Sequence, residues 1–273
     1  MRAGQFVRQP SGYTAFIPAE LPPDPPLRLD QLRLILSEAD LALGRLDGVT
    51  TNLPNPDLFV AMYVREEALL SAQIEGTQAS LTDVLEFEAG HRNAESPGEI
   101  ASAVAHVRAM NYGLNRLTSL PLSLRLIREI HRELMEGVRG EEQEPGEFRR
   151  RQNWIGPANC TLPEAIFVPP PAHELLPALS NLETYIRATA QPPLIQAGLA
   201  HAQFETIHPF LDGNGRIGRL LITFILCTRR ALSQPLLYLS HYLKRHRSEY
   251  YDRLQAVRVD GDWERWLGFF LTG

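Results

Sequence analysis

The sequence has few of the residues that mark specialised protein classes. Among its 273 residues there are only two cysteines, Cys160 and Cys227, which excludes both a disulfide-stapled scaffold and a four-cysteine zinc site. Only one lysine occurs, Lys244, and the formal net charge is −5. An acidic balance of this kind argues against a nucleic-acid-binding surface that covers the whole molecule.

Long apolar runs are also missing. No stretch approaches 18 uncharged apolar residues, so no membrane-spanning helix is expected. The first 30 residues contain Arg2, Arg8 and a proline-rich run at 22–26, but they lack the apolar core of a signal peptide. These absences predict a cytoplasmic protein. The chain is 44% hydrophobic and 22% charged, which is typical of a globular protein with its own core.

The spacing of apolar residues predicts a mostly helical chain. Residues 1–28 are expected to form an extended, Pro-rich arm, because proline fixes φ and disfavours helix in the residue before it. Residues 146–170 lack helical spacing, and their apolar residues around a Gly-Pro-Ala-Asn turn predict the only strands, as a hairpin. Apolar residues three and four apart predict helices from Leu29 onward and over 57–75, 80–88, 97–118, 123–136, 173–189, 193–206, 214–231, 241–258 and 262–271.

One segment, 208–219, concentrates side chains with chemical uses. It holds a histidine, an aspartate, three glycines and two arginines between two apolar, helical stretches. Glycine lets backbone N–H groups approach a ligand closely, and a helix that starts near Asn214 directs free N–H groups towards an anion. Arginine binds phosphate bidentately, aspartate can hold Mg²⁺ beside substrate phosphates, and histidine can accept a proton near neutral pH.

Other motifs share part of this pattern. The run from Gly213 to Gly218 matches G-x-G-x-x-G, but a dinucleotide site needs a strand before it and an acidic residue about 20 positions later. Here a helical stretch precedes it, and the first acidic residue after Asp212 is Glu249. No Gly-Lys-Ser/Thr follows, so it is not a Walker A loop. A glycine-rich turn with solvated arginines is the simplest alternative, and the added histidine and aspartate argue against it.

The segment resembles the motif of a known family. His208-Pro-Phe-Leu-Asp-Gly-Asn-Gly-Arg-Ile-Gly-Arg219 resembles the Fic motif, H-P-F-x-[D/E]-G-N-G-R-x-x-R, at every defined position. Ser71-Ala-Gln-Ile-Glu75-Gly76 is similar to the family's inhibitory motif, [S/T]-x-x-x-E-[G/N]. Residues 146–170, which begin Gly-Glu-Phe-Arg, look like its flap hairpin.

The resemblance covers roughly residues 55–255 and implies an all-α fold, a Fic core helical bundle with a small β-hairpin flap. Many relatives with this arrangement continue into a winged-helix domain, so the last helix could be the start of a further domain. The implied organisation is an extended Pro-rich arm at 1–28, an N-terminal helical region with the inhibitory motif at 29–96, a catalytic core with its flap at 97–258, and a C-terminal helix at 259–273.

The family's activity implies a function. Most Fic enzymes transfer AMP from ATP to a Ser, Thr or Tyr hydroxyl, so the resemblance implies a protein adenylyltransferase that uses ATP and Mg²⁺ or Mn²⁺. Its partner would be a target protein, or the enzyme itself, and neither nucleic acid nor membrane is expected. His208 would be the general base, Asp212 the metal ligand and Phe210 a buried anchor of the loop. The phosphates would lie on Gly213, Asn214, Gly215, Arg216, Ile217, Gly218 and Arg219, with Arg219 at the γ-phosphate.

The resemblance also implies autoinhibition. Glu75 would lie against Arg219 in the place of the γ-phosphate, and Ser71, one turn earlier on the same helix face, would hold the carboxylate or fasten the helix. Two other functions remain open. The same site could remove AMP, with Glu75 positioning a water, or it could bind nucleotide as a signal without turnover, although the intact His208 argues against the latter.

The remaining histidines carry weaker signals. His131 matches no metal motif and is expected at the surface or in a cap. His201 lies two helical turns before the motif and has no evident third ligand. His246 stands where many relatives have Asn, in a stretch with Tyr250 and Tyr251 that resembles the part of the family near the adenine pocket.

Overall fold

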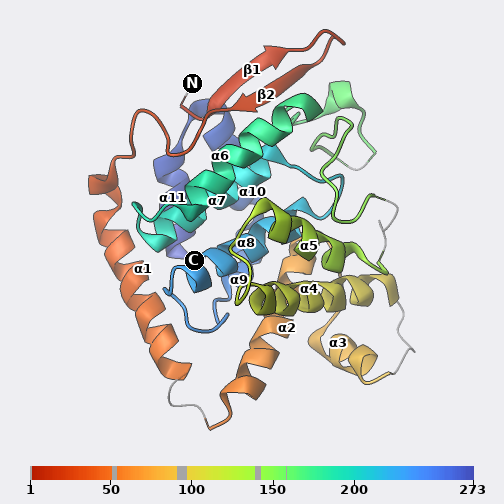
Figure 1. Ribbon diagram of the computed structural model, residues 1–273, viewed down its shortest axis with the longest axis vertical. Helices are drawn as coiled ribbons and strands as arrows, with labels where there is room; N and C mark the ends of the chain where they lie inside the picture. The colour runs from red at the N-terminus through yellow and green to blue at the C-terminus, as the bar shows by residue number, and fades with distance from the viewer. Residues whose placement is uncertain (1, 51–53, 91–96, 139–142, 158) are drawn as a thin grey trace.

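The computed structural model describes residues 2–50, 54–90, 97–138, 143–157 and 159–273. It is mostly helical, with one two-stranded sheet in the part described (Figure 1), which confirms the predicted all-α class. Its α-helices are α1 Leu29–Thr50, α2 Pro56–Ile74, α3 Leu81–Glu88, α4 Pro97–Arg116, α5 Leu124–Met135, α6 Leu175–Arg187, α7 Pro193–Ile207, α8 Asn214–Thr228, α9 Leu239–Arg245, α10 Arg247–Asp260 and α11 Trp263–Thr272. None of these described helices combines the length and apolar character needed to cross a bilayer.

Side-chain caps set where several helices begin. The Asn55 side chain accepts a hydrogen bond from the Leu58 backbone N at 3.2 Å at the start of α2. Ser80 and Asp83 form a reciprocal capping box at α3, and the Ser123 side chain caps α5. Such caps satisfy N–H groups that have no partner within the helix, so the local sequence is enough to start these helices.

Helix α7 lies at the centre of the molecule. Every residue from Leu194 to Ile207 is buried, as expected for a helix without a polar face. α6, α8, α10 and α11 pack around it. A Cβ atom at Gly198 would lie 2.9 Å from the Leu267 side chain, so α11 approaches α7 this closely only because the residue is glycine. The Trp266 indole donates to the Gly198 carbonyl at 2.9 Å.

Helix α2 is held against the core by polar contacts of its second half. It packs on α4 and α9. The buried Glu67 carboxylate accepts hydrogen bonds from the Ser240 backbone N, at 3.2 Å, and from the Ser240 hydroxyl, at the start of α9. The Lys244 ammonium donates to the Gln73 side chain at 2.6 Å. These contacts orient the end of α2 towards α8.

The strands lie elsewhere than expected. β1 Gly4–Arg8 and β2 Thr14–Pro18 pair antiparallel and form the hairpin at the top of Figure 1. Phe16 is fully buried, and the Phe16 backbone N donates to the Val168 carbonyl at 2.9 Å. The expectation that residues 1–28 form an extended arm is therefore wrong, because apolar strand residues fold back onto the core and bury there.

The flap region 146–170 contains little regular sheet. Ile155 and Phe167 form an isolated antiparallel bridge, with the Ile155 backbone N donating to the Phe167 carbonyl at 2.8 Å. The hairpin expected here is thus reduced to one pair, and residue 158 of its turn lies outside the described residues. The expected domain boundary at residues 96 and 97 falls at the edge of 91–96, which also lies outside them.

The single helix expected over 241–258 is two helices. α9 ends at Arg245 and α10 begins at Arg247, with His246 between them at φ −111° and ψ 36°. The Tyr242 and His246 rings contact each other at a tilt of 38°, with centroids 4.5 Å apart. No proline or glycine marks this break, so the periodicity of the sequence continues through it.

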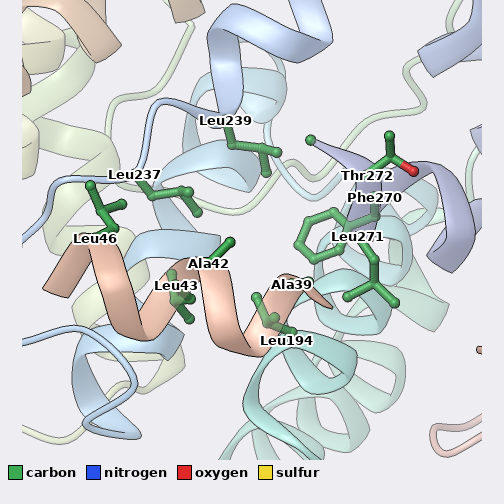
Figure 2. A pocket seen from close by; sticks show the side chains of 11 residues that line it. Ala39, Ala42, Leu43, Leu46, Leu194, Leu237, Leu239, Phe270, Leu271 and Thr272 are labelled. Atoms are coloured by element: carbon green, nitrogen blue, oxygen red, sulfur yellow. The ribbon is translucent and has the colours of Figure 1, made fainter. Parts of the chain in front are cut away.

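An apolar cavity of about 170 Å³ separates α1 from the end of α11. Figure 2 shows four α1 side chains, Ala39, Ala42, Leu43 and Leu46, on one side of it and Phe270, Leu271 and Thr272 on another. Leu194, Leu237 and Leu239 complete the labelled lining. No residue of the 208–219 segment lines this cavity.

Candidate active site

The 208–219 segment contains the turn between α7 and α8 and the first residues of α8. His208 ends α7 in the left-handed conformation, at φ 49° and ψ 61°, and Gly213 precedes α8 at φ 75°. A non-glycine residue at positive φ is uncommon and is concentrated at functional sites. The two residues reverse the chain, so that α7 and α8 pack against each other with the loop at their shared end.

Asn214 holds this loop from within. Its Oδ1 accepts a hydrogen bond from the Phe210 backbone N at 2.8 Å, and its Nδ2 donates to the Phe210 carbonyl at 2.8 Å. Both side chains are buried. Phe210 is thus a buried anchor of the loop, as expected. The Asn214 side chain, in contrast, spends both of its polar atoms on hydrogen bonds within the loop and does not face a ligand. Only the backbone of Asn214 is left for phosphate.

His131 supports the loop from α5. Contrary to the expected surface position, its side chain is 0% exposed, and it stacks on Phe210 with centroids 3.7 Å apart. Its Nδ1 accepts from the Gly146 backbone N at 2.8 Å, and its Nε2 donates to the Asp212 carbonyl at 3.1 Å. Burial lowers the pKa of His131 to about 4, so the ring stays neutral. The apolar residues along one face of α5 were the sequence signal for the burial of His131, because position 131 lies next to Ile130.

Arg149 joins the flap to the histidine of the motif. It is 2% exposed, and its Nε donates to the His208 carbonyl at 2.9 Å while Nη2 donates to the Pro170 carbonyl at 2.5 Å. The Asn153 amide donates to the Phe210 carbonyl at 2.8 Å. These bonds satisfy carbonyls at the end of α7 and so hold His208 in its left-handed conformation.

We expect Arg149→Ala to lower the free energy of unfolding by about 2–4 kcal/mol, because each buried carbonyl that loses its donor costs roughly 1–3 kcal/mol. The control is Arg150→Ala, which removes the neighbouring exposed arginine and should change stability by less than about 0.5 kcal/mol. Urea unfolding of the three proteins measures the difference. Equal stabilities of the two variants would contradict this role.

The His208 imidazole is mostly enclosed. Its Nδ1 is buried without a hydrogen-bond partner. Burial and, to a lesser degree, the positive charges of Arg258 and Arg149 lower its pKa to about 3, against the opposing effect of the Glu205 backbone carbonyl. The ring is therefore neutral at physiological pH, the state in which it can accept a proton.

Two buried arginines of α8 point towards the end of α2. The Arg219 Nε donates to the Ser71 hydroxyl at 2.7 Å, and its Nη2 donates to the Glu75 carboxylate at 2.8 Å. The Arg216 Nη1 donates to the Ser102 hydroxyl at 2.8 Å, and its Nε lies 3.2 Å from the Glu75 carboxylate. Ser71 thus bonds Arg219 and not Glu75. Burial lowers the pKa of Arg219, but the Glu75 charge acts together with Tyr250, Tyr251 and Glu205, and their combined effect raises it above its usual value.

The Glu75 carboxylate lies over the first turn of α8. A Cβ atom at Gly215 would lie 2.5 Å from its Oε1. The N-terminus of a helix attracts an anion, so the carboxylate occupies a place suited to a phosphate. Gly76, at φ 108°, follows it and turns the chain away after α2.

Ile217 is buried in the core, and a Cβ atom at Gly218 would lie 2.6 Å from the Glu205 Oε1, so both positions face inward.

Asp212 stands at the mouth of the loop. Its side chain is 47% exposed, and its Oδ1 accepts from the Gly213 backbone N at 2.6 Å. A carboxylate with a free oxygen suits Mg²⁺, which commonly takes one or two protein carboxylates together with substrate phosphates. Within the described ranges no group of three or more His, Cys, Asp or Glu side chains is placed to hold a metal ion.

The other candidate histidine, His201, is structural. It is buried, with Nδ1 2.8 Å from the Gly218 carbonyl and Nε2 2.8 Å from the Tyr250 hydroxyl. Tyr250 is buried as well, whereas Tyr251 is 42% exposed and has the Arg247 guanidinium 5.5 Å from its ring centroid. Of this pair only Tyr251 presents a face to solvent.

Comparisons with known proteins agree with these motifs. Residues 34–115 match the family model described as Fic/DOC family N-terminal, and residues 121–226 match the model described as Fic/DOC family. Proteins named protein adenylyltransferase Fic, from Aedes aegypti and Drosophila grimshawi, are 32% and 31% identical over 200 residues. The alignments cover 70% of this chain but 36% and 37% of those proteins, so the chain spans about a third of their length.

Solved structures share the fold. A Fic family protein from Desulfovibrio desulfuricans G20 superposes with a TM-score of 0.72 at 24% identity, covering 87% of this chain and 72% of that one. A Fic domain containing signaling protein from Bacteroides thetaiotaomicron gives 0.66 at 20% identity, covering 86% and 90%. Because two models of one family together match most of residues 34–226, the chain belongs to the Fic/DOC family.

Proposed function

We propose that this protein is an adenylyltransferase that transfers AMP from ATP to a Ser, Thr or Tyr hydroxyl of a target protein or of itself. The observation that carries the proposal is the place of the Glu75 carboxylate, held by Arg216 and Arg219 over the first turn of α8. A site that holds an anion in this way, beside the neutral His208, suits a nucleotide phosphate. The names of the relatives support AMP as the transferred group.

In the proposed reaction His208 is the general base. Its Nε2 takes the proton of the target hydroxyl while that oxygen attacks the α-phosphorus. A phosphorus–oxygen bond forms to the target, the bond to the bridging oxygen breaks, and pyrophosphate leaves. Arg216, Arg219 and the N–H groups at the start of α8 stabilise the phosphate charges. Most of the rate enhancement would come from positioning and fixed charge, as is usual for phosphoryl-type transfer.

Asp212 would hold Mg²⁺ or Mn²⁺ together with the phosphates, and the cation would neutralise phosphate charge when bound. A hard, oxygen-ligand site fits these ions and not zinc. The carboxylate is exposed at the loop where the phosphates would lie, so its removal takes away the protein's part of that site.

Asp212→Ala is accordingly expected to lose AMP transfer, and excess EDTA is expected to silence the wild-type protein. Asp260→Ala, at an exposed carboxylate of α10, should transfer AMP like the wild type. Labelling from ATP across a Mg²⁺ titration measures both effects. Full activity in excess chelator would rule out the metal dependence.

The same contacts suggest that the protein restrains itself. Glu75 pairs with the Arg219 Nη2 at 2.8 Å, and while it does so this nitrogen is occupied and cannot bind a γ-phosphate. ATP could bind, but its α-phosphate would lie wrongly for in-line attack. In this proposal the end of α2 is an inhibitor that leaves when its carboxylate is removed or displaced.

Removal of AMP from a modified protein is a second candidate function. The observation that favours it is the 32% exposure of the Glu75 side chain at the same site, since a partly exposed carboxylate can position an attacking water. Catalytic amounts of the protein, incubated with a labelled target and no ATP, would release AMP if this activity is the principal one.

The proposed function is tested with the Glu75→Gly variant in cell lysate, using ATP labelled on either the α- or the γ-phosphate. AMP transfer predicts protein labelling from the α-label alone, with mass spectrometry locating AMP on a hydroxyl side chain. Labelling from the γ-phosphate would show phosphate transfer. A lack of labelling from either form would reject the adenylyltransferase.

A further inference from the structure

A buried carboxyl group lies beneath His208 and has no part in the reaction described above. Glu205, in the last turn of α7, is 6% exposed. Its Oε2 lies 3.8 Å from the His208 Nδ1, and its Oε1 has no hydrogen-bond partner. The His208 Nδ1 is likewise buried without a partner. Two groups that could bond each other thus face one another in the interior.

Two buried polar groups without hydrogen-bond partners are unfavourable for the protein, and a hydrogen bond between Glu205 and the His208 Nδ1 would satisfy the pair. A buried polar atom without a hydrogen-bond partner destabilises the protein, and both of these atoms lie in its interior. Shortening 3.8 Å to a normal hydrogen bond of about 2.8 Å needs a movement of about 1 Å. Hydrogen bonds between catalytic groups are often long without substrate and shorten in the reacting complex.

The charges around Glu205 bring its ionisation into the physiological range. Burial raises the pKa of its carboxyl, Arg219 and Arg258 oppose this, Glu75 adds to it, and together they place the pKa at about 7. The titratable and charged groups that face it are His201 of α7 and His208 at its end, Arg219 of α8, Tyr250, Tyr251 and Arg258 of α10, and Glu75 after α2. Both forms of the carboxyl are therefore accessible near neutral pH.

The form of the carboxyl decides which nitrogen of His208 carries the proton. Because Nδ1 faces inward, Nε2 is the nitrogen left for the substrate. An ionised Glu205 accepts a hydrogen bond from Nδ1–H, which leaves the Nε2 lone pair free to take a proton. A protonated Glu205 donates to Nδ1 instead, and the ring then carries its own proton on Nε2 and cannot act as base.

We propose that Glu205 is a positioning residue that selects the tautomer of His208 and makes it a competent base when the carboxyl is ionised. The consequence for catalysis rests on the proposed function. During transfer the hydroxyl proton moves to Nε2, and the imidazolium keeps its Nδ1 proton hydrogen-bonded to the Glu205 carboxylate. That negative charge stabilises a cation which Arg149 and Arg258 otherwise oppose. A carboxylate behind a catalytic histidine acts in the same way in hydrolase triads.

The Glu205 backbone carbonyl is the competing partner for Nδ1, because it too favours the protonated ring. It also accepts from the Arg258 Nη2 at 3.1 Å. Glu205→Gln keeps this carbonyl and the size of the side chain but removes the ionisable group. The variant therefore distinguishes an effect of the Glu205 side chain on the His208 Nδ1 from an effect of the backbone carbonyl.

The first test follows the tautomer by nitrogen NMR of the full chain with ¹⁵N-labelled histidine and without ATP. His208→Ala identifies the resonances of residue 208. In the wild type the proton should move from Nε2 to Nδ1 as pH rises from about 5 to about 9, with a midpoint near 7. In Glu205→Gln the tautomer should not change over this range. A wild-type His208 that keeps Nδ1–H throughout would overturn the proposal, as would an unchanged transition in Glu205→Gln.

The second test is the pH profile of AMP transfer in the Glu75→Gly background. We expect kcat/KM to rise through one ionisation slightly below pH 7, since loss of the Glu75 charge lowers the pKa of Glu205 from about 7. Adding Glu205→Gln should abolish this rise of kcat/KM with pH and lower kcat/KM about tenfold or more at high pH. The same rise of kcat/KM in the variant would overturn the proposal. If the Glu75→Gly variant transfers no AMP, the proposed function fails, while the NMR titration still decides the role of Glu205.

Discussion

Replacing His208 by alanine is expected to lower AMP transfer by about 10²–10⁴-fold, which is the usual contribution of a general base, while ATP binding stays within a few-fold of wild type. The two effects separate because the phosphate-binding groups lie at 212–219, whereas the base lies alone at 208. Alanine also removes the ring next to Glu205 without touching Arg216 or Arg219. Transfer from α-labelled ATP and calorimetry of ATP binding measure the two quantities.

The matched control for this variant is His173→Ala, which removes a histidine whose side chain is 71% exposed. That variant should transfer AMP at the wild-type rate. Retention of more than about a tenth of the wild-type transfer rate in His208→Ala would contradict the assignment of His208 as the general base. Loss of ATP binding together with transfer would show that His208 acts on binding rather than on proton transfer.

Glu75→Gly is expected to raise target labelling and self-labelling about tenfold or more. The carboxylate holds Arg219 at 2.8 Å and lies 3.2 Å from the Arg216 Nε, so its removal frees both guanidinium groups for phosphate. Ser71 remains bonded to Arg219, and Glu75 lies just beyond the end of α2, so the helix itself should persist. Rates with ATP and Mg²⁺ in excess measure the change.

The expected size follows from a simple estimate. A misplacement of about 1 Å at the reacting atoms can lower a rate about 10²-fold, and a bias of about 2.7 kcal/mol gives that ratio of populations. One charge-assisted hydrogen bond contributes roughly 1.5–3 kcal/mol. The exposure of Glu75, 32% for its side chain, places the pair towards the lower end, because solvent screens it.

A double variant checks that the gain acts through the guanidinium group. Arg219→Ala in the Glu75→Gly background should cancel the increase, because the two residues are in contact and their effects are not additive. A Glu75→Gly protein that labels no better than wild type would contradict autoinhibition. If the same variant instead loses a measurable AMP-removing activity, this result would favour removal of AMP as the function.

The sequence alone determined the features that depend on near neighbours in the chain. The apolar stripe of α5, with Leu126, Ile130 and Leu134, is buried as its spacing predicts. Ser80 caps α3, and the glycine-rich turn joins two helices. These features arise from interactions within one or two helical turns, so they can be read without knowing the rest of the fold.

Only the tertiary structure decided which distant groups meet. Glu75 reaches Arg219 across 144 positions of sequence, and Arg149 reaches the His208 carbonyl across 59. Spacing predicts a helix face but not what that face packs against, so His131 was expected at the surface. For Glu205 the distant groups are arginines of α8 and α10 that come beside a residue of α7. Burial and neighbouring charge set its ionisation, and both arise only when separate helices pack together.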